Sequence, residues 1–306
     1  MTHMEALRRR SEIVNRIRNF FIELRYVEVD TPILAARPIP EAHLELFETA
    51  YLPPEYRGGD PVPLFLLPSP EYYLKQLLAA GSGSLFEITH TFRNSESVGP
   101  QHSPEFTMLE YYTVDADGDD SLGITTDLLR ALGVTAEPLI LTMEDAFARY
   151  AGVDLAALVA GTPTEPAGLK QKEEEFQKVF LTDVEPALPT DRPVFVTRYP
   201  AVVPTLARAI PGTPWADRWE LYLGGMEVAN CYGEETDPGR IEAFFRQQQA
   251  AKRENCRVQH PVEGAFLEGG APLPRCSGAA LGVDRLVMYL LGVTDIERVL
   301  SFTLFR

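Results

Sequence analysis

Two segments joined by a short loop constrain the fold of this 306-residue chain most strongly. Residues 85–92 are mainly apolar and lead into Arg93, and residues 105–114 alternate between polar and apolar types. This pattern predicts a β-hairpin with Arg93 at the end of its first strand. Since side chains two residues apart on a strand point to the same face, Glu110 and Tyr112 are expected to lie together on the second strand.

The chemistry of these three side chains suits ligand binding. The planar guanidinium of an arginine at a strand end can hold two phosphate oxygens. An acid and a tyrosine that face the same cleft suit an ammonium group. The alternative is a surface hairpin with scattered charges, and a single motif leaves that alternative open.

A second segment, residues 277–288, indicates a strand of small residues that runs into a helix. Its glycines allow a planar ligand to approach the backbone closely, and Arg285 falls at the start of the helix, within reach of a phosphate. The alternative is that Gly282 only permits tight packing and that Arg285 pairs with an acid. The combination with the Arg93 segment favours ligand binding.

The order of elements predicts an α+β fold, with an antiparallel sheet flanked by helices rather than a Rossmann sheet. We expect residues 1–306 to form a single catalytic domain with a mostly helical insertion at about residues 120–190. Neither a GxGxxG nor a GxxxxGK[ST] phosphate loop occurs. The expected elements of this region are helices at residues 121–132, 143–150 and 169–180, a connector at residues 161–166 and a strand at residues 193–200.

Together, the segments around Arg93 and Arg285 resemble motifs two and three of class II aminoacyl-tRNA synthetases of the lysine type. Residues 69–75 and 220–238 resemble the amino-acid site of lysyl-tRNA synthetases. These segments occur in the family's order, which makes the resemblance specific. It implies a class II synthetase-like catalytic domain that activates an amino acid with ATP.

Motif one of the same family is similar to the amphipathic helix expected at residues 10–21 and the segment around Pro32. Because motif one builds the dimer interface in class II enzymes, the resemblance implies a homodimer. The resemblance as a whole runs from about Arg8 to Phe305.

The motif-one helix is expected almost at Met1, which leaves no room for the anticodon-binding barrel of lysyl-tRNA synthetases. This short form resembles the elongation factor P–(R)-β-lysine ligases, synthetase paralogues that modify a protein. Like those ligases, the chain has alanine at position 280, where the synthetases have glycine. The resemblance implies that the Ala280 methyl group favours a β-amino over an α-amino group. The alternative is that glycine and alanine interchange freely there.

The charge balance favours a protein acceptor, and tRNA is an unlikely partner. The chain has 28 Lys and Arg against 44 Asp and Glu, a net charge of −16, whereas tRNA binding draws on basic surface. No apolar run approaches the roughly 18 residues that span a membrane, and the N-terminus lacks an apolar signal core. The three cysteines show no CxxC spacing, so we expect a reduced cytoplasmic protein with a packed Cys231.

The resemblance assigns roles to the residues of the ATP site. Arg93 is expected to hold the α-phosphate and Arg285 the γ-phosphate or the leaving pyrophosphate, so that fixed positive charge stabilises the transition state. Phe106 is expected to stack on adenine, unless it is a core phenylalanine, and Gly282 leaves space for the adenosine. The expected ATP-binding set is Arg93, Asn94, Ser95, Glu96, His102, Ser103, Phe106, Glu227, Val228, Gly282 and Arg285.

Glu220 and Glu227 match the acids that bind Mg²⁺ on the phosphates in lysyl-tRNA synthetases. Magnesium takes one or two carboxylates plus substrate oxygens. The seven-residue spacing requires a turn or bulge to bring both acids to one end of the cleft. The alternative is a pair of surface glutamates.

Lysine or (R)-β-lysine is expected to be held by carboxylates and a phenol, because an ammonium buried without partners is costly. The resemblance implies the substrate-binding set Ser69, Pro70, Glu71, Glu110, Tyr112, Asn230, Glu234 and Ala280. Glu235 is the alternative to Glu234, and the spacing from Asn230 favours Glu234.

Three parts of the sequence depart from the family pattern. Ser95 stands where the family has glutamate, with Glu96 one residue later, and Ser103 stands where asparagine is common. Residues 231–233 read Cys-Tyr-Gly where the ligases have Gly-Phe-His. The first departure bears on adenine recognition, and the last is expected to touch the substrate pocket.

Two other functions remain possible beside an elongation factor P ligase. The chain could activate lysine for another acceptor, such as a tRNA, a small molecule or a carrier protein. It could also be a non-catalytic paralogue that senses lysine. The presence of Arg93, Glu220, Glu227 and Arg285 favours an enzyme.

Overall fold

The computed structural model describes residues 1–54, 60–161, 166–260 and 272–304. Part of the expected connector at residues 161–166, and Phe305 at the end of the resemblance, lie outside these ranges. The chain divides into two compact units. The first unit comprises Met1–Val114, Thr236–Pro274 and Leu281–Arg306, and the second comprises Asp115–Glu235 and Arg275–Ala280.

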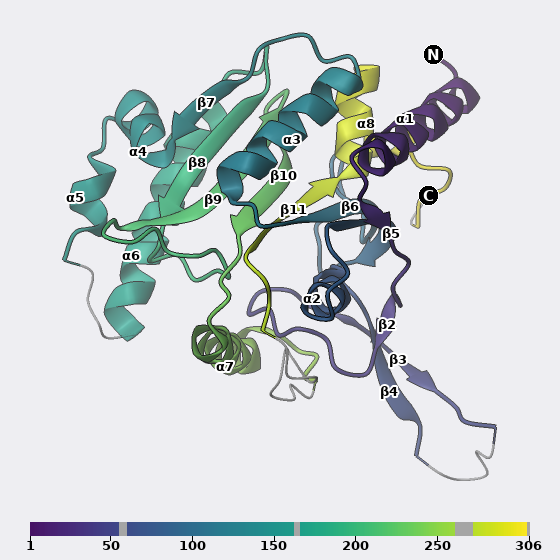
Figure 1. The fold of residues 1–306 in the computed structure, drawn as a ribbon, viewed down its shortest axis with the longest axis horizontal. Helices are drawn as coiled ribbons and strands as arrows, with labels where there is room; N and C mark the ends of the chain where they lie inside the picture. The colour runs from purple at the N-terminus through teal and green to yellow at the C-terminus, as the bar shows by residue number, and fades with distance from the viewer. Residues whose placement is uncertain (55–59, 162–165, 261–271, 305–306) are drawn as a thin grey trace. The chain divides into compact units, whose positions relative to one another are not determined.

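The first unit opens with the helix α1 (His3–Glu23), which covers the predicted motif-one helix (Figure 1). A capping box starts it, because the Thr2 hydroxyl accepts from the backbone N of Glu5 while the Glu5 carboxylate accepts from the backbone N of Thr2. The apolar face of α1 turns inward, where the Phe21 ring lies 4.8 Å from the ring of Tyr111. This face therefore belongs to the core of its own unit.

The predicted hairpin is present as β5 (Leu85–Phe92) and β6 (Glu105–Val114), which pair antiparallel. The short strand β1 (Val27–Glu28) pairs with β5 in parallel. The alternation predicted for residues 105–114 holds, and Glu110 and Tyr112 share a face, with a hydrogen bond between them.

The helix α8 (Val283–Leu291) packs on β6 and also contacts α1. Asp284 joins the three elements, because its Oδ2 accepts from the backbone N of Thr107 (2.7 Å) and its Oδ1 lies 2.6 Å from Arg10 Nη1. Arg10 also donates to the Thr107 hydroxyl (2.8 Å). These contacts attach Asp284, the residue before Arg285, to the β5–β6 hairpin and to α1.

A second, three-stranded sheet belongs to the first unit and has the order β2–β4–β3. In Figure 1 its strands β3 and β4 extend away from the rest of this unit. The strands are β2 (Leu34–Ala35), β3 (Phe47–Tyr51) and β4 (Val62–Leu66). The remaining helices of the unit are α2 (Glu71–Ala79), α7 (Pro238–Asn255) and the 3-10 turn η4 (Ile296–Arg298).

The second unit contains strands in the order β11–β10–β9–β8–β7. The pairs β8–β9 and β9–β10 are antiparallel, whereas β7 runs parallel to β8. The chain passes into the first unit near the end of β11. The strands are β7 (Leu139–Thr142), β8 (Val194–Pro200), β9 (Trp215–Leu223), β10 (Met226–Gly233) and β11 (Cys276–Gly282).

Helices cover the strands of this second unit. Within it, α3 lies along β9 and β10, whereas α4 packs on β7 and β8 (Figure 1). The stacked rings of Phe147, Phe176 and Phe180 form the centre of the helical core. The helical elements are α3 (Gly118–Ala131), α4 (Met143–Ala146), η1 (Phe147–Ala151), α5 (Leu155–Val159), α6 (Pro166–Val179), η2 (Phe180–Val184) and η3 (Glu185–Ala187).

The predicted α+β fold is confirmed, with parallel pairs where β1 and β7 join their neighbours. The expected helices within residues 120–190 are present, together with the strand β7, which the sequence did not indicate. In the described part of the chain, none of the helices has the length and apolar character that crossing a bilayer requires.

Candidate active site

Arg93 directly follows β5, and its backbone N donates to the carbonyl of Pro104 (2.9 Å), which closes the end of the hairpin. Its guanidinium carbon lies 5.3 Å from the centre of the Phe106 ring, a cation–π contact. Arg93 Nε is buried and has no hydrogen-bond partner among the described residues. The side chain therefore keeps a donor for an anion, and the guanidinium covers part of the Phe106 ring.

Asn94 anchors the loop that follows. Its Nδ2 donates to the carbonyl of Leu46 (3.2 Å), and its backbone N donates to the carbonyl of Glu45 (3.0 Å). Its Oδ1 accepts from the backbone N of Ser95 (2.8 Å), which has a left-handed φ of 57°. The expected ATP ligand Asn94 thus already bonds to the protein through its whole side-chain amide, and Ser95 forms the turn after it.

His102 lies in an electropositive environment. Burial lowers the pKa of His102, and the neighbouring Arg285 and Arg93 lower it further, while Glu96 opposes them. The imidazole is therefore neutral at pH 7. Glu96 lies near enough to His102 to raise the pKa of the imidazole. The acid that stands one residue later than in the family pattern therefore still acts on this loop.

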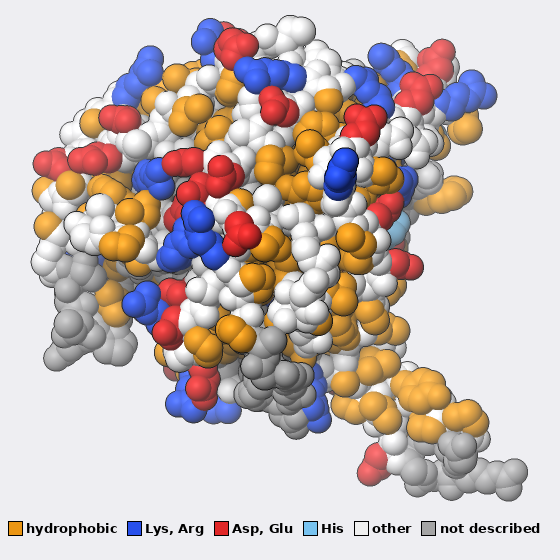
Figure 2. Space-filling model, in the orientation of Figure 1, with side chains coloured by type: hydrophobic (Ala, Val, Ile, Leu, Met, Phe, Trp, Pro, Cys, Tyr) orange, Lys and Arg blue, Asp and Glu red, His pale blue; other side chains and the backbone are white. Residues whose placement is uncertain are grey.

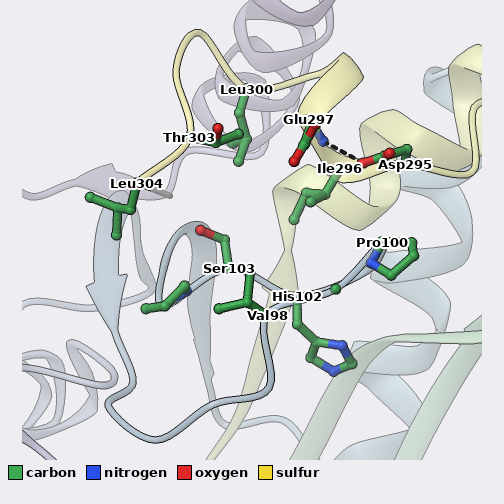
Figure 3. Close-up of a pocket in the computed structure, with 12 residues that line it drawn as sticks. Val98, Pro100, His102, Ser103, Asp295, Ile296, Glu297, Leu300, Thr303 and Leu304 are labelled. Carbon is green, nitrogen blue, oxygen red and sulfur yellow. Dashed lines mark hydrogen bonds between the residues drawn. The ribbon is translucent and has the colours of Figure 1, made fainter. Parts of the chain in front are cut away.

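A cavity of about 130 Å³ lies beside this loop, between His102, Ser103 and residues near the C-terminus (Figure 3). The backbone N of Ile296 donates to the carbonyl of Pro100 (2.7 Å) and ties the two segments together. In Figure 3 the imidazole of His102 points away from Ile296 and Leu300. Ser103 thus lines a cavity that the sequence analysis did not anticipate.

Arg285 lies in the first turn of α8, as predicted, and its Nε donates to the carbonyl of Gln101 (3.1 Å). Gly282 occupies the N-cap position of that helix. The adjacent acid, Asp284, is paired with Arg10. Arg285 is half-buried and lies close enough to His102 to lower the pKa of the imidazole. These two candidate ATP-binding residues therefore lie near each other in the first unit.

The expected ammonium site centres on Glu110, which is 3% exposed. Its two carboxylate oxygens accept from the hydroxyls of Tyr112 (2.7 Å) and Ser69 (2.8 Å). Burial raises the pKa of Glu110 to about 8, and the neighbouring Glu71 raises it as well. The result is a buried acid that becomes a carboxylate readily only when a cation joins it.

Glu71 begins α2, directly after Pro70 at the N-cap, and pairs with Lys75 at the next turn (Nζ–Oε1 2.6 Å). Its backbone N donates to the Ser69 hydroxyl (3.0 Å), which links Glu71 to the Glu110 site. Lys75 is 1% exposed, and its Nζ lies 5.8 Å from the centre of the Tyr112 ring. Lys75 ends the segment 69–75 that resembles the amino-acid site but is not in the expected substrate-binding set, although its four-residue spacing from Glu71 is typical of a helical ion pair.

Glu41 is a further acid that the sequence analysis missed. Burial raises the pKa of Glu41 to about 7, with Arg93 lowering it and Glu71 raising it. The loop that carries it is tied to α7, because Lys252 Nζ donates to the carbonyls of Glu41 (3.3 Å) and Leu44 (2.5 Å). Glu71 therefore raises the pKa of both Glu41 and Glu110 in the first unit.

In the second unit, Glu220 is 6% exposed and bonded through both oxygens. Arg218 Nη2 lies 2.5 Å from Oε1, and the Tyr222 hydroxyl donates to Oε2 (2.7 Å). Arg218, Glu220 and Tyr222 are alternate residues of β9 and share a face. Each carboxylate oxygen keeps a second lone pair, so Glu220 can still bind a cation.

Glu227 lies opposite Tyr222 in the β9–β10 pairing. The required turn is present as Gly224 and Gly225, both with left-handed φ (59° and 80°), and a bulge at Val228 shifts the register between Glu227 and Ala229. Glu227 is half-buried and Val228 is buried. The strand pairing thus contains both a turn and a bulge, where the seven-residue spacing required one or the other.

Asn230 and Tyr232 lie opposite Glu220 and Arg218 on β10, and Asn230 Nδ2 donates to the Tyr232 hydroxyl (3.2 Å). Glu234 follows two residues later and is 1% exposed, whereas Glu235 is half-exposed. Alternation along the strand places Glu234, and not Glu235, in line with Asn230.

Residues 231 and 233 occupy the opposite face from Tyr232. The Cys231 thiol lies 3.3 Å from the Ser277 hydroxyl, and burial raises its pKa, as expected for a packing residue. A Cβ at Gly233 would collide with the Asp217 carboxylate. Of the three departures at residues 231–233, only Tyr232 therefore lies with Asn230. Ala280 is half-buried in β11.

A family model described as tRNA synthetases class II (D, K and N) matches residues 2–306. A Vibrio parahaemolyticus protein named elongation factor P--(R)-beta-lysine ligase is 36% identical over 314 residues, covering 98% of this chain and 95% of its own. Proteins of the same name from Klebsiella pneumoniae and Salmonella heidelberg are 35% and 34% identical, with the same coverage.

Proposed function

Because the chain belongs to the class II tRNA synthetase family (D, K and N), we propose that it is an ATP-dependent ligase that activates (R)-β-lysine or lysine. It then transfers the aminoacyl group to a lysine side chain of elongation factor P. The name shared by its relatives supports this assignment. The observation that carries it is the buried Glu110, whose two oxygens accept hydrogen bonds from the hydroxyls of Ser69 and Tyr112, a group of side chains suited to an ammonium group.

The proposed reaction has two steps. An oxygen of the amino-acid carboxylate attacks the α-phosphorus of ATP, the bond to the β-phosphate oxygen breaks, and pyrophosphate leaves. The neutral amine of the acceptor lysine then attacks the acyl carbon, AMP leaves, and a proton is released. Arg93, with its buried Nε donor, binds the α-phosphate, and Arg285 binds the γ-phosphate end, so both oppose the charge that develops in the first step.

The remaining proposed ATP ligands follow from the geometry of their loop. Phe106 offers adenine the part of its ring that Arg93 leaves open, and the neutral His102 can donate or accept one hydrogen bond. Gly282 lets adenosine approach the backbone. The residues with a positioning or lining part are Asn94, Ser95, Glu96, Ser103 and Val228.

Magnesium is the proposed metal partner of ATP, and Glu220 and Glu227 are the residues that would hold it. Their carboxylates fit, because Mg²⁺ takes one or two carboxylates plus phosphate oxygens. Glu220 keeps a lone pair on each oxygen beside its bonds to Arg218 and Tyr222. When bound, the ion neutralises negative charge on the phosphates.

The amino acid is the substrate that the acids recognise. In the proposal, Glu110 and Glu71 compensate the ammonium charge, with Ser69, Pro70 and Tyr112 shaping the pocket. Asn230, Glu234 and Ala280 complete the set, and the Ala280 methyl group tips the choice toward a β-amino group. We propose that residues 1–306 act as one catalytic domain with an insertion at about residues 120–190, which the match over residues 2–306 supports.

A homodimer is part of the proposal. Motif one remains the proposed interface: one apolar face of α1 is buried within its own unit, whereas Met4 and Ile22 of the same helix are exposed. Hydrophobic side chains cover the projecting β3–β4 hairpin (Figure 2). Exposed apolar residues in and beside this small sheet are Ile33, Leu34, Tyr51, Leu52 and Val62. A cytoplasmic location is proposed with it, in line with three cysteines that form no disulfide.

The deciding experiment is ATP–pyrophosphate exchange with lysine, (R)-β-lysine and other amino acids, followed by transfer to elongation factor P or to tRNA. Exchange with a lysine-type substrate and a mass gain of one aminoacyl group on elongation factor P are expected. The net charge of −16 argues against tRNA as the acceptor. Exchange without transfer would point to another acceptor, and no exchange with any amino acid would point to a non-catalytic lysine sensor.

A further inference from the structure

Lys75 is a buried cation that the proposed reaction does not use. Its side chain is almost completely buried, although it ends in an ammonium group. Burying a charge is costly unless partners compensate it. Lys75 lies on α2, one helical turn after Glu71, and its Nζ is 2.6 Å from Glu71 Oε1. The ion pair compensates part of that cost and places a fixed positive charge inside the first unit.

The ammonium of Lys75 belongs to a closed ring of contacts. Its partner Glu71 donates from the backbone N to the Ser69 hydroxyl (3.0 Å). The hydroxyls of Ser69 and Tyr112 both donate to the Glu110 carboxylate (2.8 and 2.7 Å). The ring closes because Lys75 Nζ lies 5.8 Å from the centre of the Tyr112 ring, within the range of a cation–π contact. These contacts place one cation and two acids in a single buried group of side chains.

Within this group, Glu110 has no cation of its own. It is buried, both of its bonded partners are neutral hydroxyls, and it makes no ion pair among the described residues. The charge of Glu71 raises the pKa of Glu110, whereas the charge of Lys75 lowers it. A further acid, Glu87, lies opposite Glu110 in the β5–β6 pairing, and Thr31 donates to both of its carboxylate oxygens. The balance between Glu71 and Lys75 therefore acts directly on the ionisation of Glu110.

We propose that Lys75 is a positioning residue, whose ammonium balances the Glu71 carboxylate so that this group of side chains offers the substrate one negative charge, that of Glu110. The inference rests on the proposed function for the identity of the ligand. With Lys75 present, the two carboxylates and the ammonium carry one net negative charge, which matches one ammonium group. Without Lys75 the two acids would oppose each other's ionisation, and one of them would stay protonated.

The first test measures the ionisation of Glu110 in the ligand-free protein. The ¹³C signal of its carboxyl group, identified by its loss in Glu110→Gln, is followed against pH. Lys75→Met keeps an apolar chain of similar length without the charge, and it should raise the midpoint of this titration by about 1–2 pH units. Lys252→Met is the matched control, because it also removes a buried ammonium, but one that bonds to the carbonyls of Glu41 and Leu44. An unchanged midpoint in Lys75→Met, or an equal rise in Lys252→Met, overturns the proposal.

A second pair of variants gives the same answer without leaving Glu71 charged beside Glu110. Glu71→Gln leaves the Lys75 charge to act on Glu110, so the midpoint should fall below that of the unmutated protein. Adding Lys75→Met to Glu71→Gln should raise the midpoint again, toward the unmutated value. A midpoint that is the same in Glu71→Gln and in the double variant contradicts the role of Lys75, even if the single Lys75→Met variant does not fold.

Binding of the amino acid then tests the consequence for the ligand. Between pH 8 and pH 9, calorimetric affinity should rise less than about twofold in the unmutated protein but about five- to tenfold in Lys75→Met, because Glu110 then ionises at higher pH. At pH 7 the variant should bind about 10–100-fold more weakly. Equal or tighter binding by Lys75→Met at pH 7 overturns the proposal, because the substrate would then not depend on the balance of these charges.

The two proposals fail in different ways. If no amino acid binds to the unmutated protein or supports exchange, the proposed function fails and the identity of the ligand fails with it. The titration of Glu110 in the ligand-free variants still decides whether Lys75 controls its ionisation. If the unmutated protein is active and the midpoint does not move in Lys75→Met, only the inference about Lys75 fails.

Discussion

Binding of the amino acid is expected to release a proton from Glu110. Burial and the nearby Glu71 raise the pKa of this carboxyl to about 8, far above its ordinary value of 4.5, so the unliganded protein carries it protonated at pH 7. An ammonium group beside Glu110 favours the carboxylate and lowers this pKa. Because the bound state then holds fewer protons than the free state, binding must strengthen as the pH rises.

The size of the effect follows from the pKa of about 8. The ionised fraction of Glu110 in the free protein is about one-hundredth at pH 6, one-tenth at pH 7 and one-half at pH 8. Affinity should therefore rise about tenfold from pH 6 to pH 7, then flatten above pH 8. At pH 7 about 0.9 proton should leave per bound amino acid. A lysine-like side-chain ammonium stays charged over this range, since its pKa is about 10.4.

Isothermal titration calorimetry at pH 7 in two buffers of different ionisation enthalpy measures the number of protons released. Glu110→Gln should reduce that number by about 0.9, flatten the pH dependence and weaken binding by roughly 30- to 1,000-fold, or about 2–4 kcal/mol. The matched control is Glu105→Gln on the same strand, since the Glu105 side chain is 40% exposed and pairs with His90. Unmutated protein that releases no proton at pH 7 would refute the reasoning, as would a Glu110→Gln variant that keeps the original pH slope.

Other predictions follow from the same geometry. Arg93→Ala and Arg285→Ala should each lower pyrophosphate exchange by about 10²–10³ while the circular dichroism spectrum stays unchanged, and normal exchange in either variant removes that arginine from its role. Ala280→Gly should raise kcat/KM for lysine relative to (R)-β-lysine by about 10–200-fold, and an unchanged ratio means that the methyl group does not select the substrate. Gly233→Ala should lower the free energy of unfolding by about 1–3 kcal/mol in urea titrations, because its Cβ meets Asp217, and a neutral result would contradict the close approach. Light scattering at micromolar concentration should give about twice the chain mass of 34.1 kDa, and a mass near 34.1 kDa would exclude the dimer.

The hairpin of β5 and β6 could be predicted from the sequence because the residues that determine it are close together in the chain. Two apolar or alternating runs separated by a short loop determine both the pairing and the face on which Glu110 and Tyr112 lie. The strands β1 and β7 were not predicted. They have two and four residues and pair in parallel, so they depend on partners distant in sequence and carry no periodic pattern of their own.

Among the acids and bases of the candidate site, the sequence identified those within recognisable segments and missed those that long-range contacts place. Glu41 is brought to its position by a loop tied to Lys252, 211 residues further along the chain, which no local pattern reveals. Arg218 and Lys75 could have been found. Arg218 alternates with Glu220 on a strand, and Lys75 lies one helical turn after Glu71.

The departure at residues 231–233 shows why a change from a family pattern must be interpreted one strand face at a time. Tyr232 faces Arg218 and Asn230, so its hydroxyl bears on the candidate substrate site. Gly233 faces the other way, and the Asp217 carboxylate fills the space beside it. Asp217 also accepts from the backbone N of Gly118 and from Arg208, so its position is fixed by a buried polar network within the second unit. A larger residue at position 233 would have to displace that carboxylate, so glycine at position 233 is required by the place that Asp217 occupies. The change at Tyr232 is a separate one, on the strand face that also carries Asn230.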